Sequence, residues 1–227
     1  SLFVGHTIYR RAFARRNCGR PFGVGPMPLP MEIAAMDFTT NFVRAKSPCT
    51  QGYRWLVRNH QQGGDYQQVL DSMVEAGRVD DACWMLNQFG PTNAVLKLNA
   101  LEAEAVVFAG TIEVSGGIEV DSIVRAGRSI RAGGGIRAGR VIMAGDDIQA
   151  GAAIRSGDTL ESGGDIRCDM GIETLGAIRC GGGLRVGWDV RCGGAFDAAD
   201  NVMVGQDLLV DGAIVCGKGL HVRGGIT

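Results

Sequence analysis

The sequence lacks the features that mark membrane spans, secretion signals and structural zinc sites. It contains no run of 18 apolar residues, and it opens without the continuous apolar segment of a signal peptide. Its seven cysteines include no CxxC or CxxxC pair. We therefore expect a soluble, cytoplasmic chain with reduced thiols, no membrane span, no metal and no other cofactor.

A large charge excess and the familiar catalytic motifs are also missing. The 23 Lys+Arg residues nearly balance the 24 Asp+Glu residues, so a nucleic-acid partner is not expected. No GxSxG, HExxH or Walker motif occurs, and no GxGxxG precedes a helical pattern. We expect a protein that is not an enzyme.

The first 30 residues differ from the rest of the chain. They hold five arginines and no acidic residue, and they end in the Gly/Pro-rich run PFGVGPMPLP. We expect residues 1–30 to form a flexible basic tail. An organellar transit peptide and a basic arm for nucleic acid or lipid are the alternatives.

Residues 31–95 carry helical patterns and are expected to form a small helical module. Asp65 and Gln68 have capping-box spacing, and the apolar residues that follow recur at helical intervals as far as Gly77. A second pattern runs over 79–89 before Gly90-Pro91, so the two helices should form a hairpin. Two shorter helices are expected upstream, around Phe38–Phe42 and Tyr53–His60. The segments SPCTQGYRWLVRN and DDACWMLNQFG resemble helical segments of uncharacterised bacterial proteins, a resemblance that implies no activity.

A six-residue repeat dominates the remainder, assigned as residues 96–227. Every sixth residue from Val106 to Ile226 is large and apolar, and from Val114 to Val222 the second residue after each is small or β-branched. Both face the same side of a strand, while the residue between them, which is mostly polar, faces the other side. Glycine commonly follows, among 36 glycines in all, and we expect it to supply positive φ angles at tight corners.

Strands of three residues separated by corners predict a mainly β fold, a triangular parallel β-helix. In this β-solenoid three six-residue sides form one coil of 18 residues, and the 122 residues from 106 to 227 give about 6.8 coils. The small helical module would precede the solenoid.

The hexads resemble those of hexapeptide-repeat β-solenoids, and the run IRAGGGIRAGRVIMAG is especially similar to bactofilins, which are polymer-forming bacterial cytoskeletal proteins. The resemblance covers residues 106–227 and implies self-association. Hexapeptide acyltransferases match less well, because they place the small residue two positions before the aliphatic one. The helical module also departs from the bactofilin plan of short tails.

Residues 18 apart should align along the rod. Arg131, Arg167 and Arg185 would share one column with Gln149, which makes them a candidate partner surface. A second column would hold Arg137, Arg155, Glu173 and Arg191. Carboxylates outnumber basic residues over 101–227, however, so we expect these arginines to pair with neighbouring acids. Stacked aspartates such as Asp147 with Asp165 are expected to be solvated corner residues rather than cation ligands.

The leading hypothesis is a non-catalytic structural or interaction protein that forms homo-oligomers through the open C-terminal coil. The hexad register continues to Ile226, which leaves no cap in this sequence. The residues expected to make this contact are Leu208, Ile214, Leu220, Val222 and Ile226. One alternative is an adaptor, inhibitor or immunity-type module that binds another protein through its helices. Another is an acyltransferase-like enzyme that uses His221.

Overall fold

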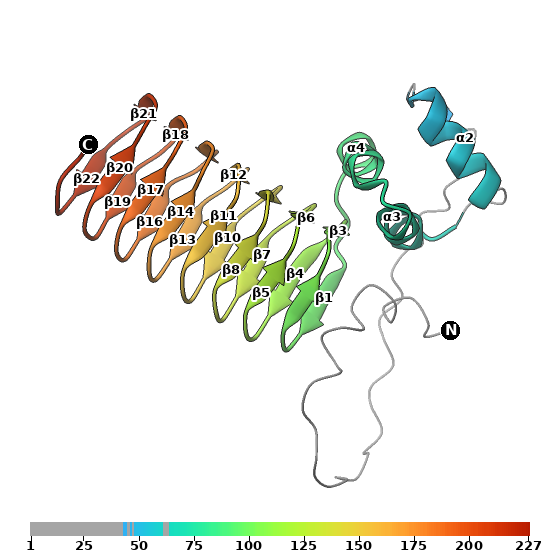
Figure 1. Cartoon of the computed structure of the whole chain (residues 1–227), viewed down its shortest axis with the longest axis horizontal. Coiled ribbons are helices and arrows are strands. Elements are labelled where there is room, and N and C mark those ends of the chain that lie inside the picture. Colours follow the sequence, from blue (N-terminus) through green and yellow to red (C-terminus); the bar gives the residue numbers. More distant parts are fainter. Residues whose placement is uncertain (1–42, 45, 47, 61–63) are drawn as a thin grey trace, which may run out of the picture.

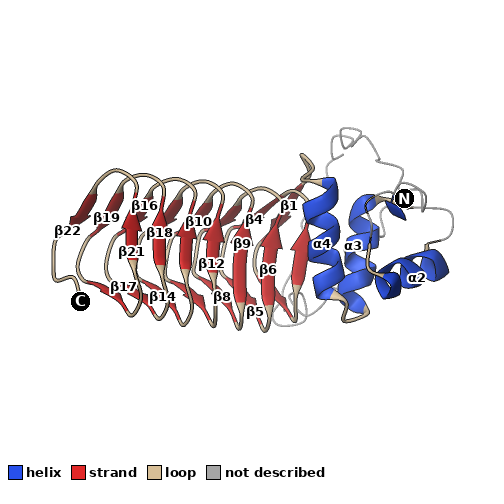
Figure 2. Cartoon of the chain, turned by 90° about the horizontal axis from the view of Figure 1, so that it is seen from above, coloured by secondary structure: helices blue, strands red, loops and turns tan. Residues whose placement is uncertain are grey.

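The hexad repeat folds as a β-solenoid of about seven coils, preceded by three helices, as the sequence predicts. The structure is a computed structural model, and it describes residues 43, 44, 46, 48–60 and 64–227. The coils follow one another along a rod, and the helices lie at its N-terminal end (Figures 1 and 2). Three parallel sheets form the sides of the rod, and we call them sheets A, B and C.

Each sheet receives every third strand of the chain, so each coil contributes one strand to each side. Sheet A contains β1 Val95–Leu98, β4 Thr111–Val114, β7 Ile130–Ala132, β10 Ile148–Ala150, β13 Ile166–Cys168, β16 Leu184–Val186, β19 Val202–Val204 and β22 Leu220–Val222. Sheet B contains β2 Leu101–Ala103, β5 Ile118–Val120, β8 Ile136–Ala138, β11 Ile154–Ser156, β14 Ile172–Thr174, β17 Val190–Cys192 and β20 Leu208–Val210. Sheet C contains β3 Val106–Phe108, β6 Ile123–Ala126, β9 Val141–Ala144, β12 Leu160–Ser162, β15 Ile178–Cys180, β18 Phe196–Ala198 and β21 Ile214–Cys216.

The predicted 18-residue register is confirmed over most of the rod. Ile148 pairs with Ile166, for example, and Ile166 pairs with Leu184. The first coil is shorter, because Leu96 pairs with Ile112 and Leu101 with Ile118, offsets of 16 and 17 residues. The solenoid therefore begins with β1, upstream of Val106, where the six-residue register is not yet established.

The core is a column of aliphatic side chains along the axis of the rod. The large apolar residues of the hexads are fully or almost fully buried from Ile112 to Leu208, and Phe196 is the largest of them. The small residues of the hexads lie inside as well, including the buried Ala150 and Cys168. Alternating inward and outward positions thus place an apolar column inside and polar side chains outside.

The corner glycines do not adopt the positive φ angles that we expected. Among the described residues, positive φ angles at glycine occur only at Gly77 and Gly90, in the helical module. The corner glycines are instead required by close stacking. A Cβ added to Gly145 would overlap the carbonyl oxygen of Gly127 in the preceding coil, and one added to Gly163 would overlap that of Gly145. Glycine lets the backbones of successive corners approach each other.

The three described helices begin and end close to the expected residues. They are α2 Thr50–Asn59, α3 Tyr66–Glu75 and α4 Val79–Phe89. The Asp65 side chain caps α3 by accepting hydrogen bonds from the backbone N–H groups of Gln67 and Gln68. Gly77 and Gly90 have φ values of 70° and 80° and follow α3 and α4, as expected for helix stop signals. The helix expected around Phe38–Phe42 lies outside the described residues.

The stacking of corners predicts that a methyl group is tolerated at some corner glycines and not at others. A Cβ at Gly157 would overlap the carbonyl oxygen of Gly139, whereas a Cβ at Gly117 would lie 3.4 Å from its nearest neighbour. We expect Gly157→Ala to lower the free energy of unfolding by about 1–3 kcal/mol and Gly117→Ala to change it much less. Urea unfolding followed by circular dichroism measures both, and equal effects would contradict the stacking explanation.

Candidate functional site

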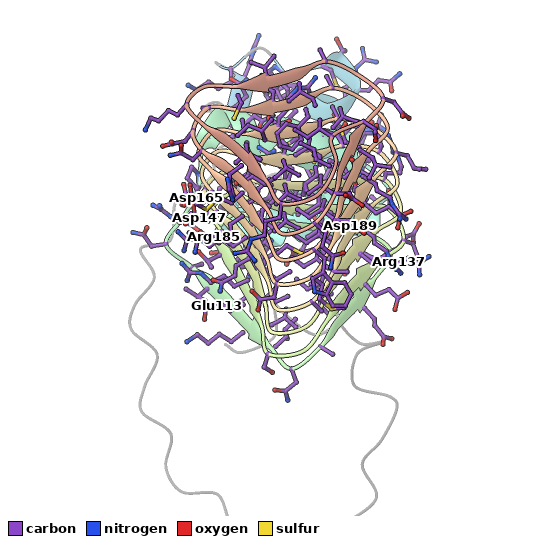
Figure 3. The ribbon with its side chains drawn as sticks, turned by 90° about the vertical axis from the view of Figure 1, so that its left-hand side faces the viewer. Glu113, Arg137, Asp147, Asp165, Arg185 and Asp189 are labelled. Carbon is purple, nitrogen blue, oxygen red and sulfur yellow. The ribbon has the colours of Figure 1, made fainter. Side chains whose placement is uncertain are left out.

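The outward side chains form columns along each sheet, as the register predicts. Arg131, Gln149, Arg167 and Arg185 are successive partners on sheet A. Arg137, Arg155, Glu173 and Arg191 are successive partners on sheet B. Figure 3 shows Arg185 and Glu113 on one side of the rod and Arg137 on another.

The sheet A column is only partly available as a basic surface. Arg131 Nη1 lies 3.2 Å from Glu113 Oε1, and Arg167 Nη2 lies 3.0 Å from Asp165 Oδ2. Arg185 has no acidic partner among the described residues, and its Nη2 lies 3.5 Å from Met203 Sδ. Two of the three predicted arginines are therefore neutralised in place, and Arg185 remains as an isolated cation.

The stacked corner aspartates form hydrogen bonds between coils. Asp147 Oδ1 accepts from the backbone N–H of Asp165 at 2.9 Å, and Asp165 Oδ1 accepts from that of Gly183 at 2.9 Å. Asp189 and Asp207 repeat the arrangement at another corner. Within the described part of the chain, no group of three or more His, Cys, Asp or Glu residues is placed to hold a metal ion. Each of these carboxylates thus links one coil to the next.

The inward cysteines and serines stabilise the corners in a similar way. Cys168 Sγ donates to the carbonyl oxygen of Ala152 at 2.9 Å, and Cys180 Sγ donates to that of Gly164 at 3.1 Å. Ser162 makes the equivalent bond to Asp146. Burial raises the pKa values of Cys168 and Cys180, which keeps both thiols protonated as donors. These thiols act as small buried side chains with a weak hydrogen bond.

The residues predicted for self-association differ in accessibility. Leu208 is fully buried, whereas Ile214 and Val222 are partly buried and pack against the core. Leu220 and Ile226 are 38% and 51% exposed. The last two side chains are therefore available for contact, and Leu208 serves the fold.

A set of outward apolar residues was missed by the sequence analysis. Met203, Leu209 and Val215 occupy outward positions on the three different sheets, and Leu175 and Trp188 lie at corners. All five are exposed. The signal was present in the hexads, because the position between the aliphatic and the small residue is charged in every hexad from Arg155 to Asp197 and apolar in the next three.

The helical module covers the N-terminal edge of sheet C. The Gln67 side chain on α3 bonds to β3, which is the edge strand: Nε2 donates to the carbonyl of Val107 at 3.0 Å, and Oε1 accepts from the N–H of Ala109 at 2.8 Å. One coil later, the equivalent N–H of Gly127 donates to the carbonyl of Phe108 in the preceding strand. One side-chain amide therefore replaces the strand that would otherwise precede β3.

Asp71 completes this junction. Its Oδ1 accepts from Gln67 Nε2 at 2.8 Å, which holds the amide in the orientation that β3 requires. The pKa of Asp71 is raised to about 7, chiefly by burial; the Gln67 hydrogen bond opposes this rise, and the nearby carboxylates of Glu75 and Asp65 contribute to it. A partly buried carboxyl group with a raised pKa thus lies at the contact between the helices and the solenoid.

Fold and surface together define a parallel β-solenoid protein with an N-terminal helical module. A family model described as the YdhT N-terminal domain matches residues 36–90, which include all three described helices. No curated protein and no solved structure matches the chain significantly. In the described segments, no helix combines the length and apolar character needed to cross a membrane.

The Gln67 contact predicts a specific loss when its amide is removed. Gln67→Ala would leave the buried N–H of Ala109 and the carbonyl of Val107 without these partners. We expect faster hydrogen exchange at the Ala109 amide and a loss of about 1–3 kcal/mol in the free energy of unfolding. Gln68→Ala, at the exposed neighbouring position, is the matched control. Unchanged exchange at Ala109 would show that the amide does not close this edge.

Asp71 predicts a pH dependence of stability with a defined sign. Its carboxyl group has a pKa of 3.8 in the unfolded chain and about 7 in the folded chain, so folding takes up a proton between these values. The free energy of unfolding should therefore fall as the pH rises from about 4 to about 7. In Asp71→Asn this fall should be smaller, since the amide stays neutral, and Asp211→Asn at an exposed corner is the control. Urea titrations at several pH values measure the effect, and identical profiles would refute it.

Proposed function

We propose that this chain is a non-catalytic structural protein of bactofilin-like, hexapeptide-repeat type that self-associates through the C-terminal part of its β-solenoid. One observation carries the proposal: the exposed large hydrophobic residues are concentrated there. Among the described residues they are Val95, Leu175, Trp188, Met203, Leu209, Val215, Leu220 and Ile226. All but Val95 follow residue 174.

The contrast with the rest of the rod supports this location. The outward column of sheet B carries Glu119, Arg137 and Arg155 in its N-terminal part, whereas it ends in Leu209. Scattered exposed apolar residues are ordinary on protein surfaces, but a concentration in one region indicates an interaction site. Contact with another copy would remove these side chains from water.

The rod also suits a structural role. Its coils are linked by backbone ladders and by side-chain bonds such as those of Asp147 and Cys168. Solenoids with such regular nearest-neighbour contacts provide extended rigid surfaces. A cytoplasmic location is part of the proposal, and the six described cysteines, all of them free, support it.

Light scattering across a hundredfold range of concentration tests the proposal. We expect the molar mass of the wild-type chain to increase with concentration. Replacement of both Leu220 and Ile226 by Asp should reduce this increase, because a charge would replace an exposed apolar contact at each position. A constant monomer mass of the wild type would contradict self-association and favour the alternative of a binding module.

A further inference from the structure

The outer face of sheet B carries a patch in which apolar and charged residues are arranged in register. We define the sheet B patch as Met170, Glu173, Leu175, Trp188, Arg191 and Leu209. Leu175 is 72% exposed and Trp188 is 50% exposed, and Arg191 is exposed between them. Tryptophan and arginine are the residues most often found at the energetic centres of protein interfaces.

The patch is organised as two neighbouring rows. Glu173 on β14 is the direct partner of Arg191 on β17. At the corner before these strands, Trp188 lies one coil after Met170, and its backbone N–H donates to the carbonyl of Met170 at 3.1 Å. At the corner after them, Gly193 stacks in the same way on Leu175. Each residue of the β14 row thus has its counterpart one coil further along the rod.

The charges of the patch leave one cation available. Glu173 Oε2 lies 3.5 Å from Arg155 Nε, on the side away from β17. Arg191 takes part in none of the ion pairs or side-chain hydrogen bonds formed among residues 48–60 and 64–227. Arg191 can therefore accept a carboxylate from outside the chain without breaking an existing pair.

Two copies of this face are complementary in one orientation. If two rods lay side by side in the same direction, related by a two-fold axis parallel to them, each residue of the central column would face its own copy, so Glu would meet Glu and Arg would meet Arg. If the two-fold axis instead ran parallel to the strands, midway between β14 and β17, the rods would point in opposite directions. The β14 row of one copy would then face the β17 row of the other. Glu173 would then face the partner's Arg191, Met170 would face the partner's Trp188, and Leu175 would face the partner's Gly193. One pair of opposite charges, one apolar pair and one large-to-small pair would coincide in this arrangement, and Leu209 would face the partner's Arg155 one coil further out.

We propose that two copies of this chain pair side by side through their sheet B patches, with the rods antiparallel and Glu173 opposite the partner's Arg191. Trp188 and Leu175 would supply buried apolar area, and the two ion pairs would fix register and direction. This inference rests on the proposed self-association and adds a side-by-side contact to the one expected at Leu220 and Ile226. The sheet lies on the side of the rod where Figure 3 shows Arg137 and Asp189.

Charge reversal with complementation tests the pairing. Arg191→Glu alone and Glu173→Arg alone would each place like charges opposite one another twice in a homodimer. We expect each to raise the dissociation constant at least tenfold at low ionic strength. When the two variants are mixed, every contact in the mixed dimer joins opposite charges, so association should return towards the wild-type value. Sedimentation velocity measures all three samples.

The control is Arg185→Glu, which reverses an exposed arginine in the same coil on sheet A and should leave the dissociation constant unchanged. Melting followed by circular dichroism verifies that each variant is folded. If the wild type associates and neither single variant weakens it, or if mixing restores nothing, the sheet B pairing is wrong while self-association stands. If the wild type does not associate at any concentration, the proposed function fails as well.

Discussion

The rod depends on one constraint: the backbone of each coil must lie a single strand spacing, about 4.8 Å, from the coil before it. In the core, aliphatic side chains stack at this spacing in a continuous buried column from Ile112 to Leu208. At the corners the same spacing brings a carbonyl oxygen so close to the next coil that glycine is needed, as at Gly145 and Gly163. It also allows Asp147 to reach the backbone of Asp165 and Cys168 to reach that of Ala152. Core, corners and polar ladders are thus consequences of one repeat distance.

The same constraint creates an edge problem, because the first coil has no preceding coil to bond with. Unpaired edges of this kind invite non-specific pairing with other strands. In sheet C the helical module solves the problem with the side-chain amide of Gln67, which offers one donor and one acceptor at the spacing of a peptide group. Asp71 orients that amide from the next turn of α3. The helices within the segment matched by the YdhT family model therefore cover the sheet C edge of the first coil, through their contacts with β3.

The fold could be predicted from the sequence because the core requires a large apolar residue at every sixth position. The helices could be predicted because Asp65 is a local start signal and Gly77 and Gly90 are local stop signals. The short first coil could not be predicted, since its offsets of 16 and 17 residues break the rule. The prediction that the corner glycines adopt positive φ angles was wrong. A glycine in the sequence does not reveal whether it is needed for a positive φ angle or for the close approach of another backbone segment. Gln67 was missed because its partners lie 40 and 42 residues away and no periodicity connects them. The outward apolar residues could have been predicted from the hexads, because they occupy the intervening position, which is polar in most other hexads.

The outward positions are the ones that the fold leaves free, and this makes them informative about function. A triangular coil needs its aliphatic and small residues inside, whereas the residue between them in sequence points outward and can be any polar residue. The appearance of Met203, Leu209 and Val215 at these positions, with Trp188 and Leu175 at the corners, is therefore not required for folding. A contact with another molecule, which would remove these side chains from water, best accounts for apolar residues at positions where polar residues would fold equally well. In the proposed pairing, the alternation of Glu173 and Arg191 along one column would give the contact its direction, because a charge pattern distinguishes antiparallel from parallel neighbours where apolar area alone does not.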